Sequence, residues 1–173
     1  MVLRTFSLSP DQLDALRARH VASPDQSWIP EVVRTQGWQA ANTLYLKWER
    51  QRSADAMADL LAVLGIDGPR DPDEAIELLE LAFEVFAPPT GFAGSLRRDP
   101  GHKLYVLNTH CPTNALMEDQ HGLGVTACAS WHRRRGWLDA LHVEATDSVL
   151  SEQRWGSPAC SALLSIQAVL PRE

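Results

Sequence analysis

Three cysteines offer the clearest chemistry in this sequence of 173 residues. Cys111 follows a strand-like stretch, Cys128 lies near the start of a helical stretch, and Cys160 begins another strand-like stretch. Their spacing matches neither the paired Cys-x-x-Cys of structural zinc sites nor a thioredoxin-type motif. Each cysteine lies at the end of an expected element, however, so the three side chains could meet in one site. The alternative is a set of buried core thiols, because cysteine is among the most buried residue types.

One histidine is placed to bind the same metal ion as the second cysteine. His132 follows Cys128 by four residues, so both side chains would lie on one helix face, about 5–6 Å apart at their Cβ atoms. Thiolate and imidazole together suit zinc, iron or copper. We therefore predict a metal site, with zinc as the first choice, formed by Cys111, Cys128, Cys160 and His132. Three thiolates alone could instead hold an iron–sulfur cluster.

A thiolate could also act directly as a nucleophile. It must first lose its proton, which a helix N-terminus or a nearby cation favours. The candidate catalytic residues are Cys128, Cys111 and His132. The substrate contacts expected from their closeness in sequence to the cysteines are Trp131, Trp155 and Arg154. Core packing is the alternative role of the tryptophans.

Other polar residues are further candidates, each with a structural alternative. Glu118, Asp119 and His121 could supply a general base or a metal ligand, or could form a solvated helix end. The basic run 132–135 could bind a carboxylate or phosphate, or could form an exposed helix face. An inward-facing Asp147 could act as a base beside the cysteines.

Composition excludes several functional classes. The net charge of −6 argues against a nucleic-acid-binding surface. The sequence contains no Gly-rich phosphate loop, no His-Glu-x-x-His and no Gly-x-Ser-x-Gly. It has no apolar run of the roughly 18 residues that a membrane span needs, and its first residues do not resemble a signal peptide. We expect a cytoplasmic protein that binds a small-molecule substrate, with neither nucleic acid nor membrane as a partner; a homodimer stays open.

The first half of the sequence predicts helices. Signals for a helix start, in which a capping residue precedes a proline, occur at 9–11, 23–25 and 71–74. Apolar residues recur at helical spacing from Trp28 to Trp48, and Gly37 could bend that helix. Ser53 is expected to cap a further helix that ends near Gly65.

The second half predicts a small sheet. Strands are expected at 92–96, 102–109, 143–150 and 160–170, with a short helix at 112–120 and a long one at about 125–141. The order is β-β-α-β-β. We therefore predict an α+β fold in which an N-terminal helical section packs on a small antiparallel sheet with one long helix. The boundary between the sections, 1–89 and 90–173, is expected near Pro88-Pro89, with both parts in one compact unit.

Three short segments resemble a known family. They are 108–112 (Asn-Thr-His-Cys-Pro), 125–128 (Val-Thr-Ala-Cys) and 154–161 (Arg-Trp-Gly-Ser-Pro-Ala-Cys-Ser). In this order they resemble the L-2-amino-thiazoline-4-carboxylic acid hydrolase-like family. The last segment is also similar to the closing motif of 4-vinyl reductase-type domains. An acidic residue often follows the second cysteine of the hydrolase-like family, whereas His132 stands in that stretch here.

The resemblance covers about residues 104 to 168 and implies a function. The resemblance implies that water opens a ring that contains sulfur and nitrogen. It also implies that Cys111, Cys128 and Cys160 form the site. We therefore predict a small-molecule hydrolase if the chain is an enzyme. The alternative is a ligand- or metal-binding sensor or partner module of the 4-vinyl reductase-like type, without catalysis.

Overall fold

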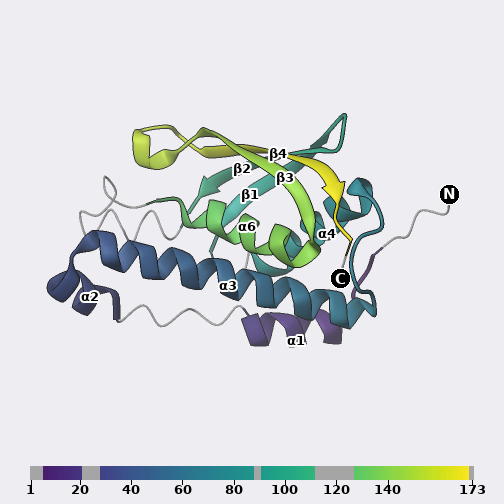
Figure 1. The fold of residues 1–173 in the computed structure, drawn as a ribbon, viewed down its shortest axis with the longest axis horizontal. Coiled ribbons are helices and arrows are strands. Elements are labelled where there is room, and N and C mark those ends of the chain that lie inside the picture. Colours follow the sequence, from purple (N-terminus) through teal and green to yellow (C-terminus); the bar gives the residue numbers. More distant parts are fainter. Residues whose placement is uncertain (1–5, 21–27, 88–90, 112–126, 172–173) are drawn as a thin grey trace.

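A computed structural model describes residues 6–20, 28–87, 91–111 and 127–171. The helices and strands in these ranges are α1 (Pro10–His20), α2 (Trp28–Gln36), α3 (Trp38–Leu64), α4 (Pro72–Phe86), β1 (Ala93–Asp99), β2 (Lys103–His110), α6 (Ala129–Leu141), β3 (Val143–Ser151), the 3-10 turn η3 (Gln153–Trp155) and β4 (Cys160–Val169). The predicted α+β class is confirmed, because the helical N-terminal section packs against a four-stranded antiparallel sheet (Figure 1). No helix in the described part of the chain is long and apolar enough to cross a membrane.

The sheet has the strand order β1-β2-β4-β3, with all neighbours antiparallel. Alternate residues of the central strands point to the helical side, because strand side chains alternate between the two faces. On β2 these residues include Leu104 and Val106, which lie opposite Leu164 and Ala162 of β4 and are buried with them. The next pair along this row is Asn108 and Cys160, so the apolar face turns polar at one end.

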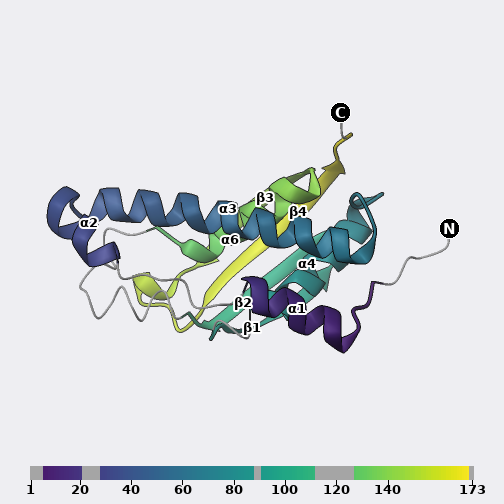
Figure 2. The same ribbon diagram turned by 90° about the horizontal axis from the view of Figure 1, so that it is seen from below.

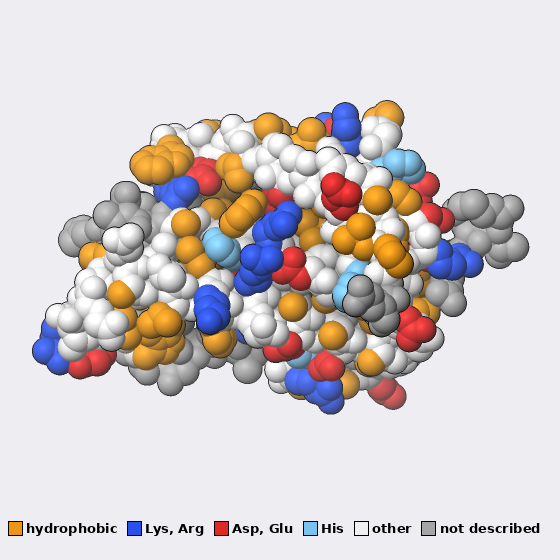
Figure 3. All heavy atoms as spheres, viewed as in Figure 1, with side chains coloured by type: hydrophobic (Ala, Val, Ile, Leu, Met, Phe, Trp, Pro, Cys, Tyr) orange, Lys and Arg blue, Asp and Glu red, His pale blue; other side chains and the backbone are white. Residues whose placement is uncertain are grey.

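The helices form a layer on one face of the sheet. In both views α3 runs along the molecule and α6 lies between α3 and the sheet (Figures 1 and 2). Figure 3 shows basic side chains gathered where these two helices run side by side. An exposed ion pair joins the helices there, with Arg50 Nε 2.6 Å from Asp139 Oδ2.

Gly136 allows the two helices to approach closely. A Cβ atom at this position would lie 2.2 Å from the carbonyl oxygen of Arg50 and 2.9 Å from Cβ of Ser53. Only a residue without a side chain fits such a contact. The position of α6 is therefore fixed by backbone packing against the middle of α3.

The two largest apolar clusters of the described residues stabilise the fold. The larger one contains residues from both sections of the chain, including Met57 and Leu79 of the helices and Leu164 of β4. The smaller one joins α2, the first turns of α3 and the start of α6 through Ile29, Tyr45 and a few neighbours. The part of the molecule around α2 thus depends on a small core of its own.

The helix boundaries correct one prediction from the sequence. Ser53 does not cap a helix; it is buried inside α3, which continues unbroken to Leu64. The break falls instead at Gly37, whose positive φ of 84° separates α2 from α3. The expected ends at Gly65 and Asp71 are confirmed: Gly65 is left-handed, and Asp71 accepts a hydrogen bond from the Glu74 backbone N–H.

Other sequence predictions lie outside the described residues. These are the helix start at 23–25, the short helix at 112–120, the first part of the helix expected at 125–141, and the proline stop at 88–89. The helix that the structure describes begins at Ala129. The four strands lie within a few residues of their predicted bounds.

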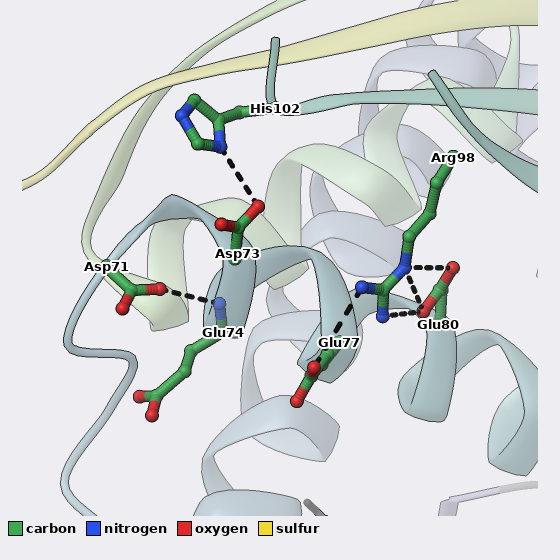
Figure 4. A network of polar contacts seen from close by, with 7 residues as sticks. All are labelled: Asp71, Asp73, Glu74, Glu77, Glu80, Arg98 and His102. Carbon is green, nitrogen blue, oxygen red and sulfur yellow. Dashed lines mark hydrogen bonds and ion pairs between the residues drawn. The ribbon is translucent and has the colours of Figure 1, made fainter. Parts of the chain in front are cut away.

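Polar contacts attach the first hairpin to α4 (Figure 4). Arg98 of β1 pairs with Glu80, and its guanidinium also lies 3.9 Å from Glu77. In the turn between β1 and β2, His102 Nδ1 lies 3.0 Å from Asp73 Oδ1. Since these groups are partly or largely exposed, they orient the hairpin more than they stabilise it.

Candidate functional site

The end of the sheet near the start of α6 contains a small cavity with a mostly apolar surface, which we call the thiol pocket. Its lining residues come from β2, α6, β3, β4 and the segments beside them: Asn108, Cys128, Ser130, Arg134, Val149, Ser151, Glu152, Cys160, Ser161 and Ala162. The cavity volume is about 10 Å³, counted as space open to the centre of a water molecule. That is room for about one water.

Local structure explains how the two thiols meet. Cys160 is the first residue of β4 and pairs across the sheet with Asn108 of β2. Cys128 occupies the N-cap position of α6 in an extended conformation, and its side chain makes no capping hydrogen bond. The Sγ of Cys160 accepts a hydrogen bond from the backbone N–H of Gln153 at 3.2 Å. A strand start and a helix start thus bring two cysteines to one cavity.

Asn108 is the polar side chain that stands out in this pocket. Its relative exposure is 3%, and among the described residues its Oδ1 has no hydrogen-bond partner. Gly94 of β1 leaves room for it, since a Cβ there would lie 2.8 Å from that oxygen. A buried carbonyl without a donor costs about 1–3 kcal/mol. A bound molecule that donates a hydrogen bond to this oxygen would remove that cost.

The charges of the thiol pocket are paired within the protein. Arg134 donates from Nε to Asp147 Oδ2 at 2.8 Å and from Nη2 to Oδ1 at 3.1 Å. Both side chains are buried, with exposures of 7% and 1%. Glu152 forms an ion pair with Arg154. The pocket therefore has polar groups without an excess of either charge.

Cys111 lies apart from the other two cysteines. It is buried among Ala87 and Phe92, in an apolar cluster against which Phe83 packs. It is not one of the residues that line the thiol pocket. The structure thus brings Cys128 and Cys160 together and gives Cys111 apolar surroundings.

His132 and Trp131 contact each other on α6 rather than lining the thiol pocket. Their rings meet edge to face, with centroids 4.7 Å apart. Burial lowers the pKa of His132, and the charge of Arg50 lowers it further. The imidazole is therefore neutral near pH 7 and is not held as a cation beside the thiols.

The two remaining predicted contacts lie in the turn before β4. Trp155 is 65% exposed, and the guanidinium of Arg154 lies 5.0 Å from the centre of its ring. Arg154 forms an ion pair with Glu152, a residue that lines the pocket. Neither side chain lines the cavity itself. Roles for these residues in binding stay predictions.

The zinc prediction receives no support. Within the described ranges, no three His, Cys, Asp or Glu side chains form a group that could hold a metal ion. Cys111, Cys128, Cys160 and His132 all lie in those ranges. Glu118, Asp119 and His121, the further candidates for a base or ligand, lie outside them.

Apart from Cys128 and Cys160, the residues that line the pocket were not among the principal sequence candidates, and three of them show why. Asn108 continues the inward alternation of Leu104 and Val106, so that pattern could have identified it as a buried amide. Ser130 is buried in the first turn of α6. Arg134 belongs to the basic run, but its partner Asp147 is thirteen residues away, and only the fold pairs them.

Comparison with known proteins finds a distant likeness to solved structures. No protein-family model matches the chain, and no curated protein matches it. A solved structure, an H-NOX protein from S. oneidensis in the Fe(II)NO ligation state, aligns with a TM-score of 0.44 and 11% sequence identity. The alignment covers 91% of this chain and 89% of the other.

These findings correct the prediction of a ring-opening hydrolase, which is wrong. The solved structure found is described by the ligation state of its iron and not as a hydrolase. Neither the family models nor the curated proteins supply a hydrolase relative.

Proposed function

We propose that this chain is a small-ligand-binding module, without catalysis, whose site is the thiol pocket. The observation that carries the proposal is Asn108, a fully buried amide whose oxygen has no partner among the described residues and which lines a cavity beside two thiols. Natural proteins pair nearly all such groups. A ligand that donates a hydrogen bond would satisfy this one.

The surroundings favour a neutral ligand over an ion. Arg134 and Glu152 are each neutralised by a partner of this chain, so an added charge would meet no unpaired counter-charge in the pocket. Val149 and Ala162 supply apolar wall, and the thiols supply soft, polarisable contact. The volume admits a group of about the size of one water, such as a single donor group of a larger molecule.

The same contacts argue for binding rather than turnover. General acid–base catalysis needs a titratable group within hydrogen-bond reach of the reacting atoms. Of the described residues that line the pocket, the charged ones are tied in ion pairs, and none is a histidine. The N-terminus of α6 at Cys128 would favour a thiolate, but no described lining residue outside the ion pairs is a carboxylate or an imidazole that could transfer protons during turnover.

A titration followed by NMR tests the proposal. Acetamide, formamide and methanol serve as neutral probes that donate a hydrogen bond, and the ¹⁵N-labelled chain reports binding. We expect saturable shifts at residues 108, 128, 130 and 160. Asn108→Leu should abolish them, and Cys128→Leu, which fills the pocket from the N-cap, should weaken them at least tenfold. Gln167→Leu, an exposed amide on β4, is the matched control and should bind normally.

Two results would overturn the proposal. One is the absence of saturable shifts around the pocket with all three probes while the protein remains folded. The other is purified protein that retains about one iron or zinc per chain and loses it in Cys128→Leu, because a metal would then occupy the site. The iron-containing alternative stays a prediction, which this metal analysis decides.

A further inference from the structure

A second cavity lies on the helical side of the molecule, and we call it the arginine pocket. It is lined by residues of α1, α3, α4 and α6: His20, Arg52, Ser53, Ala56, Phe86, Arg133 and Trp137. Its volume is about 20 Å³ on the same measure as above. It shares no lining residue with the thiol pocket.

Two guanidinium groups in this pocket share one carboxylate. Arg133 donates to Oε1 of Glu49 from Nε at 2.7 Å, and its Nη2 contacts the same oxygen. Arg52 is less well matched, with Nη1 3.7 Å from Glu49 Oε2. Glu49 is 1% exposed, and among the described residues its Oε2 has no hydrogen-bond partner. The three side chains therefore carry a net charge of +1 in a largely buried place.

The other charged groups at this pocket do not cancel that charge. His20 lies 2.8 Å from Asp59, and Arg19 pairs with the same carboxylate oxygen. These two hydrogen bonds lower the pKa of Asp59, that of Arg19 most strongly, so the carboxylate stays charged and is already satisfied. Arg52 donates to the backbone carbonyl of His20, which contributes a dipole but no charge.

The excess positive charge also affects the pKa of Arg52. Burial lowers its pKa most, and the neighbouring charge of Arg133 lowers it further, while Glu49 opposes both. An anion beside the two guanidinium groups would relieve both effects, because their N–H donors form a fork that matches carboxylate and phosphate oxygens. Trp48 and Phe92 hold the groups by cation–π contacts at 5.2 and 4.3 Å.

We propose that the arginine pocket binds a small anion, a carboxylate or phosphate group, between Arg52 and Arg133. The cavity admits little more than one oxygen at a time, so the anionic group enters by an edge and the rest of the ligand stays at the opening. Ala56, Phe86 and Trp137 form the apolar part of the cavity lining. This proposal does not rest on the function proposed for the thiol pocket, with which the site shares no lining residue.

Thermal unfolding in different anions tests the proposal. Sodium phosphate and sodium acetate are compared with sodium chloride at constant ionic strength, since a ligand that binds only the native state raises the melting temperature. We expect a saturable rise with phosphate or acetate and none with chloride. A rise with phosphate alone identifies a phosphate site, and a rise with acetate alone a carboxylate site.

Two variants make the result specific. Arg52→Gln should weaken the apparent affinity at least tenfold. Glu49→Gln should strengthen it at least threefold, because the competing carboxylate is removed, even if the variant is less stable without the anion. Arg34→Gln, which breaks an exposed pair with Glu31, is the matched control and should change nothing. Equal responses to all three salts, retained affinity in Arg52→Gln, or weaker binding in Glu49→Gln would each overturn the proposal.

Discussion

Arg134 extends from α6 to the sheet, where it pairs with Asp147 of β3. Its bidentate pair with Asp147 links α6 to β3 while both side chains are nearly inaccessible to water. Such a pair contributes little net stability compared with apolar residues, but removal of one partner leaves a buried charge. The sequence analysis considered Asp147 as a catalytic base, and its pairing with Arg134 gives it a structural role.

Removal of this carboxylate should therefore be costly. We expect Asp147→Ala to lower the free energy of unfolding by about 3–5 kcal/mol, because Arg134 would remain buried without a counter-charge. The double variant Arg134→Met, Asp147→Leu should recover most of the loss. Urea unfolding measures both. Asp139→Ala breaks the exposed pair with Arg50 and should cost about 1 kcal/mol or less; equal losses in the two single variants would contradict the argument.

His132 should make the native state sensitive to mild acid. Its pKa is lowered in the folded protein, so the unfolded chain takes up a proton first as the pH falls below about 6.5. Stability contributed by the neutral imidazole is thus present above that pH and is lost as the pH falls toward the folded-state pKa. We expect His132→Gln to flatten this acid-side loss in urea unfolding between about pH 5 and 8.

The control for this prediction is His142→Asn, at an exposed histidine in a left-handed position. It should keep the pH dependence of the wild-type protein. If His132→Gln and the wild-type protein lost stability in parallel as the pH fell, burial of this imidazole would not be the cause.

At the scale of elements, the contact between α3 and α6 depends on Gly136, which has no side chain. Gly136→Ala would ordinarily stabilise a helix, by about 0.5–1 kcal/mol. Here the added methyl group would meet the Arg50 carbonyl, so we expect a loss of about 1–3 kcal/mol. The melting temperature should fall by about 2–4 °C for each kcal/mol. Lys47→Ala, exposed on α3, should have no such effect, and a more stable Gly136→Ala would refute the close contact.

The sequence predicted the strands well and the helix boundaries less well. Strand positions follow from local alternation, such as that of Leu104 and Val106, and local patterns are what a sequence shows directly. The assignment of Ser53 as a cap failed because its hydroxyl-bearing side chain also suits a tight helix contact. That contact is with Gly136, more than eighty residues away, and spacing gives no sign of it.

Only part of the site could be predicted from the sequence, again because local patterns do not show contacts between distant residues. Cys128 and Cys160 end elements whose order places them at one end of the sheet, and they do line one pocket. Cys111 also ends an element, but it packs with Phe92 instead. The partnerless oxygen of Asn108 depends on what surrounds it in three dimensions, so it could not be read from residue type and spacing.

The apolar clusters of the molecule differ in size, so we expect its regions to differ in their free energy of opening. The cluster around α2 is small, whereas the main core joins helices from the first section to β2 and β4. Segments with few buried apolar contacts open at lower free energy than the global transition. The region around α2 is therefore expected to open first.

Hydrogen exchange measured by mass spectrometry in low concentrations of urea checks this expectation. Amides of α2 should lose protection well before those of β2 and β4. Ile29→Ala should speed exchange in α2 alone, whereas Leu164→Ala should lower protection throughout the chain, because its side chain lies in the main core. The same urea dependence for α2 and β2 would show that the two clusters unfold as one unit.

The glycine contact between α3 and α6 also has a mechanical consequence. Arg133 and Arg134 are adjacent in α6, yet one lines the arginine pocket and the other the thiol pocket. Gly136 holds this helix against α3 without an intervening side chain, as a pivot would. A small rotation about the pivot would displace both guanidinium groups in one movement. A ligand that binds one orientation of α6 more tightly would then change the affinity of the other cavity for its own ligand. The second ligand would change the affinity for the first by the same factor.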